Sequence, residues 1–235
     1  MSRVSLVSVR PVERLNFGYA PWTWRFADQR RREIDAFFSG ECKENPSLWN
    51  GRLLLLRDVQ FAEQTLSGTF FEADYASLLA ALSWEAMGQT VKACFPRAAI
   101  FGSDGGLILG EMAPHTRNAG QLLFPSGSVE LIDVNGHQVD FEGALRREIM
   151  EETGIDPQML TTEKGWHVIS AGPRLPLIKV AHLDEPAEKL RRRIIANLSA
   201  QLQPEFRDIA IVRDRSVITD RMPPWVRGFL RHIWS

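Results

Sequence analysis

The stretch Arg147–Ile155, which reads REIMEETGI, is the most informative part of this 235-residue chain. We expect it to form the last turns of a helix that runs from about Phe141 to Thr153. Asp140 is placed to cap the start of this helix, and Gly154 is placed to end it. The rest of the expected fold is arranged around this helix.

Three glutamates, Glu148, Glu151 and Glu152, share one face of the expected helix, because successive residues turn by about 100°. Their like charges repel each other by roughly 0.2–0.5 kcal/mol per neighbouring pair. Only Arg147 is placed to offset this repulsion on the same face. Hard Mg²⁺ prefers carboxylate oxygens together with water and phosphate oxygens. The pattern therefore favours a divalent metal ion on this face over the alternative of a solvated, charged helix.

The same stretch resembles the signature of the Nudix hydrolase family, R-E-U-x-E-E-x-G-U with U an aliphatic residue, and it meets every fixed position. The upstream segment 125–130, PSGSVE, looks like the proline-glycine turn that precedes this helix in the family. The resemblance implies an α/β/α sandwich with a mixed sheet. It also implies hydrolysis of a nucleoside diphosphate linked to another moiety.

The resemblance assigns a role to each matching residue. It makes Glu148, Glu151 and Glu152 ligands of Mg²⁺, or of Mn²⁺ in its place, and it lets Arg147 brace their carboxylates. Gly127 would let the loop backbone approach the metal closely. Bound metal ions neutralise phosphate oxygens and lower the pKa of a water that attacks phosphorus.

The chain departs from the family pattern between the turn and the helix. Five residues separate Gly127 from Asp133, which stands where the family has glutamate, and thirteen residues rather than seven separate Asp133 from Arg147. The six extra residues, 134–139, contain the turn-forming pair Asn135-Gly136. We expect a hairpin-like excursion that leaves both flanking pieces in place.

A further acidic residue from a later loop often serves the family as ligand or general base. Glu205 is the first candidate, and Asp184 and Glu185 are the next. Each of them is equally well explained as a solvated carboxylate at a helix end.

Strands and helices interleave along the chain without strict βαβ regularity, which indicates a mixed α/β or α+β fold. We divide the chain into an N-terminal α+β lobe, 1–95, and a Nudix hydrolase domain, 96–235. The expected helices are 27–38, 75–82, 141–153, 185–201 and 224–233. The expected strands are 5–9, 52–57 and 69–73 joined through a Ser67-Gly68 turn, 98–101, 107–109, 166–170, 177–181 and 209–212.

The N-terminal lobe carries no catalytic signature. Its segment 45–51, NPSLWNG, followed by a strand, a hairpin and a helix containing Tyr75, is similar to the N-terminal part of UDP-glucose-cleaving Nudix enzymes. This similarity suggests a UDP-sugar as substrate, with coenzyme A diphosphatases as the nearest alternative.

The loop before Gly127 contains His115, Arg117 and Asn118. These side chains can bind phosphate or base, since arginine forms paired hydrogen bonds with phosphate oxygens. The alternative is an ordinary solvated loop.

Composition limits the partners and the location. A formal charge of -1 offers no global field for nucleic acid or anionic lipid, and no run of 18 apolar residues predicts a membrane span. Two cysteines, Cys42 and Cys94, lack metal-ligand spacing and suit a reducing cytoplasm. We therefore expect a cytoplasmic enzyme with a small nucleotide substrate, in a family whose members often form homodimers.

Two alternative functions, from classes other than this type of hydrolase, remain. A Nudix-type module could bind a nucleotide without cleaving it, although such modules commonly lose some of the helix glutamates that this chain keeps. An RNA-cap-processing enzyme would use the same chemistry, but it would need a basic groove that the charge pattern does not indicate.

Overall fold

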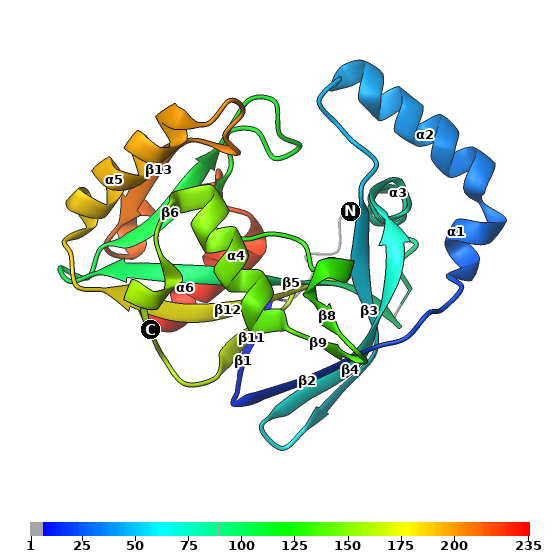
Figure 1. Cartoon of the computed structure of the whole chain (residues 1–235), viewed down its shortest axis with the longest axis horizontal. Coiled ribbons are helices and arrows are strands. Elements are labelled where there is room, and N and C mark those ends of the chain that lie inside the picture. The colour runs from blue at the N-terminus through cyan, green and yellow to red at the C-terminus, as the bar shows by residue number, and fades with distance from the viewer. Residues whose placement is uncertain (1–6, 89) are drawn as a thin grey trace.

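The computed structural model describes residues 7–88 and 90–235, which form a mixed α+β structure as expected (Figure 1). The helices are α1 (Arg25–Gln29), α2 (Arg31–Glu44), α3 (Tyr75–Ser83), α4 (Phe141–Thr153), α5 (Ala187–Ala200) and α6 (Pro224–Ile233). The strands are β1 (Ser8–Val12), β2 (Arg14–Tyr19), β3 (Arg52–Ala62), β4 (Thr65–Asp74), β5 (Val91–Gly102), β6 (Leu107–Met112), β7 (Leu122–Leu123), β8 (Val134–Asn135), β9 (Gln138–Val139), β10 (Thr161–Thr162), β11 (Trp166–Ser170), β12 (Arg174–Leu183) and β13 (Phe206–Val212). None of the helices in this described part is long and apolar enough to cross a membrane.

Strand β5 belongs to both parts of the chain. It pairs in parallel with β12 from Ala93 to Gly102, and its first residues pair in antiparallel with β3. The main strand order is β1-β11-β12-β5-β3-β4-β2-β9-β8, with β6 also beside β5 and flanked by β13 and β7. The boundary expected near residue 95 thus falls inside β5, and the division into a lobe and a domain stays a prediction.

Helices cover both faces of the sheet around β5. Neighbouring residues of a strand point to opposite faces, and β5 shows this at Arg97 and Ala98. Arg97 lies against Trp225 of α6, whereas Ala98 lines a small cavity with Leu145 and Ile149 of α4. Figure 1 shows α4 in front of β5 and β12 and α6 behind them. The expected helix-sheet-helix arrangement is therefore confirmed.

Aromatic side chains join the two parts in one hydrophobic core. Phe17 of β2 packs on Phe70 of β4 and on Phe141 of α4, with ring centroids 5.3 and 5.2 Å apart. Phe141 in turn meets Trp166 of β11 at 5.5 Å. All four side chains are buried, and each such burial contributes about 1.5–3 kcal/mol. This packing holds the start of α4 at the junction of the two parts.

The helix that carries the glutamates has the predicted bounds. The side chain of Asp140 accepts a hydrogen bond from Gly143 N at 2.8 Å, which caps the first turn. Gly154 ends the helix with φ 66°, a left-handed conformation that glycine adopts at little cost. The predicted strand 166–170 and helix 224–233 also have their expected bounds.

The six extra residues before α4 form the expected hairpin. Strands β8 and β9 pair Val134 with Val139 and Asn135 with Gln138, and Gly136 has φ 63° in the turn. At its base, Asp140 N donates to Asp133 O at 2.8 Å. The excursion therefore closes on itself and leaves α4 in place.

Two local predictions are wrong. The helix expected over 27–38 is two helices. Arg30 separates α1 from α2, because its φ of −113° and ψ of 19° are not helical. The pair Ser67-Gly68 lies inside β4 rather than in a turn, and the chain reverses at Glu63, which has φ 52°. Gly68 is needed there for packing, since an added Cβ would lie 2.8 Å from Leu56 Cδ1. Of the strand expected over 5–9, residues 5 and 6 lie outside the described residues, and β1 extends to Val12.

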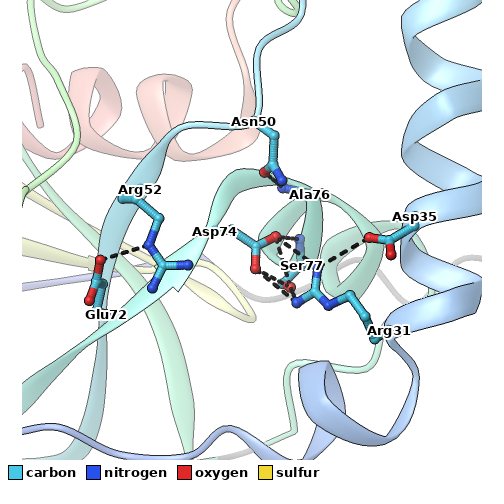
Figure 2. Close-up of polar contacts among 8 residues, drawn as sticks. All are labelled: Arg31, Asp35, Asn50, Arg52, Glu72, Asp74, Ala76 and Ser77. Atoms are coloured by element: carbon cyan, nitrogen blue, oxygen red, sulfur yellow. Dashed lines mark hydrogen bonds and ion pairs between the residues drawn. The ribbon is translucent and has the colours of Figure 1, made fainter.

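A partly buried ion pair fixes α3 against α2 (Figure 2). Asp74 caps α3 by accepting from Ser77 N at 2.9 Å, and its other oxygen accepts from Arg31 Nη2 of α2 at 2.8 Å. Asn50 Oδ1 accepts from Ala76 N at 2.8 Å and ties the preceding loop to the same turn. Burial alone would raise the pKa of Asp74, but its bonds from Arg31 and Ser77 outweigh burial and lower it.

We expect Asp74→Ala to destabilise the protein by about 2–4 kcal/mol, because it removes a helix cap and leaves Arg31 without its buried partner. Urea unfolding measures the change. Asp35→Ala is the matched control, since exposed Asp35 lies 3.4 Å from the same arginine and should contribute less than about 0.5 kcal/mol. Equal losses in the two variants would contradict the assignment.

Candidate functional site

Helix α4 presents its three glutamates in three different environments. Glu152 is buried, and its Oε2 accepts a hydrogen bond from Ser126 N at 2.6 Å. The side chain of Glu148 is 12% exposed, whereas that of Glu151 is 58% exposed. The helix therefore fixes two carboxylates within the protein and leaves the third near solvent.

Gly127 creates the space that the Glu148 carboxylate occupies. A Cβ atom added at Gly127 would lie 1.9 Å from Glu148 Cδ, much closer than atoms can approach. The loop is held against β5, because Ala98 N donates to Pro125 O at 3.0 Å and Arg97 pairs with Ser126. Gly127 is thus required for close contact between this loop and α4.

We expect Gly127→Ala to displace Glu148 and to destabilise the protein by about 1–3 kcal/mol through overpacking. Thermal or urea unfolding measures the change. Gly40→Ala is the control, because nothing lies within 4 Å of the added Cβ and alanine favours helix α2. A Gly127→Ala variant as stable as Gly40→Ala would contradict this account of the loop.

Arg147 braces the acidic residues, as the family resemblance implies. Its Nη1 donates to Glu148 Oε1 at 2.5 Å and lies 3.4 Å from Glu151 Oε2. Its Nη2 lies 3.3 Å from Asp133 Oδ2, and the same oxygen accepts from Glu130 N at 2.9 Å. Asp133 therefore holds Arg147 from the side opposite the glutamates.

Burial dominates the electrostatics of the two inner carboxylates. It raises the pKa of Glu148 to about 7, with Glu151 and Glu205 adding repulsion and Arg147 opposing it. Burial also raises the pKa of Glu152 well above its ordinary value, with a further contribution from Glu205. A positive charge placed among these groups would lower the pKa of both carboxyl groups.

We expect the metal-free protein to lose stability as the pH rises from about 4.5 to about 7. In this interval the folded state keeps a proton on Glu148 that the unfolded state has released, so a higher pH favours unfolding. The raised pKa of Glu148 thus lowers the free energy of unfolding over this interval by on the order of 3 kcal/mol. Urea unfolding with a chelator measures it, and Glu148→Gln should lose this part of the slope. A slope unchanged in Glu148→Gln would contradict the raised pKa.

A single cleft of about 1060 Å³ brings the expected site residues together. Its lining includes His115, Arg117, Gly127, Arg147, Glu148, Glu151, Glu152 and Glu205. Glu205 stands directly before β13, and its backbone oxygen accepts from Ala113 N at 2.7 Å. Asp184 and Glu185 do not line the cleft, and Glu185 pairs instead with Arg193 at 3.4 Å. Of the three later acidic candidates, the geometry favours Glu205.

The loop containing His115 and Arg117 lines the cleft and contacts the first part of the chain. Arg117 Nη1 lies 2.5 Å from Glu41 Oε2 of α2, and Asn45 Nδ2 donates to His115 O at 2.9 Å. Both residues therefore connect the second part of the chain to the first. A role of these two side chains in binding substrate stays a prediction.

The donor chemistry of the cleft suits a hard dication. Six carboxylates line it, and burial and mutual repulsion disfavour the charged forms of Glu148 and Glu152. Within residues 7–88 and 90–235, no three His, Cys, Asp or Glu side chains are already arranged to hold an ion. Glu151 is the most exposed of the three helix glutamates.

The structure adds one residue to the site that the sequence reasoning missed. Arg97 of β5 lines the cleft, and its charge acts on Glu148, Glu152 and Glu205. The available signal was a lone arginine within an otherwise largely apolar strand, between Phe95-Pro96 and Ala98-Ala99.

Comparison with family models finds no match to this chain, and comparison with curated proteins finds none. Solved structures give weak likenesses. A Nudix hydrolase from M. smegmatis, RenU, is 16% identical with a TM-score of 0.40, over 60% of this chain and 82% of that one. A MutT protein from Methanosarcina mazei Go1 is 18% identical with a TM-score of 0.40, over 60% and 91%. DR0079 from Deinococcus radiodurans is 16% identical with a TM-score of 0.35, over 62% and 90%.

Proposed function

We propose that this chain is a Nudix-type, Mg²⁺-dependent hydrolase that cleaves the diphosphate bond of a nucleoside diphosphate linked to another moiety. The observation that carries the proposal is the Arg147–Ile155 signature on α4, with its three glutamates lining a deep cleft beside the Gly127 loop. Mn²⁺ is expected to replace Mg²⁺, since both accept carboxylate oxygens.

The residues of the cleft have distinct parts in this chemistry. Glu148, Glu151 and Glu152 would hold the metal, which supplies charge neutralisation at phosphate oxygens and an activated water. Ser126 fixes the orientation of Glu152, and Arg147 fixes that of Glu148. Positioning of this kind reduces the reorganisation that the reaction would otherwise require.

Glu205 is proposed as the acidic residue that completes the site. It is exposed to the cleft, and its charge raises the pKa of both Glu148 and Glu152 after the larger effect of burial. A carboxylate of this cleft that is near enough to act on the charges of both Glu148 and Glu152 is a candidate to accept a proton from an attacking water.

The substrate moiety beyond the diphosphate is proposed to meet the first part of the chain. The wall contributed by this part is formed largely by apolar and aromatic side chains of α3 and the segment before β3, namely Leu48, Trp49, Tyr75, Leu78, Leu79 and Leu82. Trp49 is 77% exposed, which is unusual for a large aromatic side chain and leaves its ring available for stacking. Together with the similarity of segment 45–51, this wall supports a UDP-sugar as the first candidate substrate and coenzyme A as the second.

We propose a cytoplasmic location and a small-molecule partner, as expected from the two free cysteines and the near-neutral charge. Nucleic acid is not an expected partner. A homodimer stays a prediction.

We expect Glu152→Gln to lower turnover by about 100-fold or more in Mg²⁺, because it removes a charged ligand while keeping the side-chain volume. The matched control is Glu142→Gln on the same helix, since Glu142 is 46% exposed and pairs only with Arg146 among the described residues. Unchanged turnover in Glu152→Gln would remove the proposed role.

The substrate assay uses UDP-sugars, ADP-ribose, NADH, coenzyme A and dinucleoside polyphosphates, with products identified by mass. A preference for UDP-sugars supports the proposed substrate class. Binding of a nucleotide sugar without any product in Mg²⁺ or Mn²⁺ would favour the alternative of a non-catalytic binding module.

A further inference from the structure

Arg97 lines the cleft and lies beside two aromatic rings. Its guanidinium carbon is 4.5 Å from the ring centroid of Phe95 and 5.2 Å from that of Trp225. The side chain is deep enough for burial to lower its pKa to about 10, yet part of its surface faces the cleft. Arg97 therefore remains positively charged at neutral pH and accessible to a bound ligand.

The polar groups of Arg97 lack the partners that a buried cation normally has. Nη1 has a long hydrogen bond of 3.4 Å to Phe124 O, and buried Nε has no partner among the described residues. No described carboxylate lies within 4.0 Å of it, whereas Arg31 and Arg147 both form such pairs. A buried charge without a partner costs several kcal/mol by general estimates, so an external anion is its natural counter-ion.

The position of Arg97 places this unpartnered cation beside the acidic end of the cleft. Its backbone pairs with Ser126, whose N–H donates to Glu152. Glu152, Glu205 and Glu148 each act on its charge without contacting it as ion pairs. A diphosphate bound at the glutamates would therefore lie near the positive charge of Arg97.

We propose that Arg97 binds one phosphate of the substrate's diphosphate through paired hydrogen bonds and holds it against the face of α4 that carries the glutamates. The planar guanidinium matches phosphate geometry, and contact with the rings of Phe95 and Trp225 restrains the side chain before substrate arrives. This inference rests on the proposed hydrolase function and names the residue that recognises the group common to all of its candidate substrates.

The competing explanation is that Arg97 only offsets the negative charge of the carboxylates. That role predicts a change in the stability of the ligand-free protein, with no change in affinity for phosphate groups. The proposed contact instead predicts lost affinity for diphosphate and a raised KM, with a smaller effect on kcat.

Calorimetric titration with inorganic diphosphate in Mg²⁺ at neutral pH separates these explanations. We expect Arg97→Gln to weaken binding on the order of 10- to 100-fold, as for the loss of a charged hydrogen bond. Arg97→Lys should be several-fold weaker than the unmodified protein, because lysine cannot form paired bonds with one phosphate. Arg146→Gln, on the exposed side of α4, should bind diphosphate normally.

Unaltered affinity in Arg97→Gln would overturn the inference, as would a failure of the unmodified protein to bind diphosphate. If Arg97→Gln does not fold, Arg97→Lys decides, and unmodified affinity in that variant overturns the paired contact. Diphosphate binding through Arg97 without hydrolysis of any nucleotide would leave the inference standing and refute the proposed function. Normal hydrolysis together with unaltered diphosphate affinity in Arg97→Gln would support the proposed function and refute the inference about Arg97.

Discussion

The close contact between the Glu148 carboxylate and Gly127 is the constraint on which the candidate site depends. It requires a residue without a side chain in the loop, and it requires that loop to be held by β5. The result is a charged group enclosed by backbone, with Arg147 as its nearest cation. Burial of like charges at such a position is unfavourable, which is the physical basis of the metal ion proposed for this site.

Short-range features of the fold could be predicted because their causes are local. The bounds of α4 follow from Asp140 and Gly154, and the 134–139 hairpin follows from Asn135-Gly136. The turn was wrongly predicted at Gly68 because glycine is used both in turns and at close packing contacts. In β4 it permits close packing against Leu56, and a single sequence does not distinguish that requirement from a turn.

The candidate site was predictable where one helix carries it and not where distant segments meet. Glu148, Glu151 and Glu152 are encoded by helical spacing, and the structure places them in one cleft. Arg97 was missed because its surroundings come from Phe124 and Trp225, which are far away in sequence. The contacts of Arg117 with α2 were equally invisible, since they depend on how the two parts of the sheet join.

The continuity of β5 also bears on how a ligand can enter and leave. Hinge motion between the two parts would have to bend a hydrogen-bonded strand that carries Arg97 near its middle. Such bending would break hydrogen bonds between β5 and its neighbours, which opposes a hinge at this place. Exchange of ligand is expected instead to occur by local displacement of the loop that bears His115 and Arg117, which is held to α2 and to the loop after it by one ion pair and one hydrogen bond.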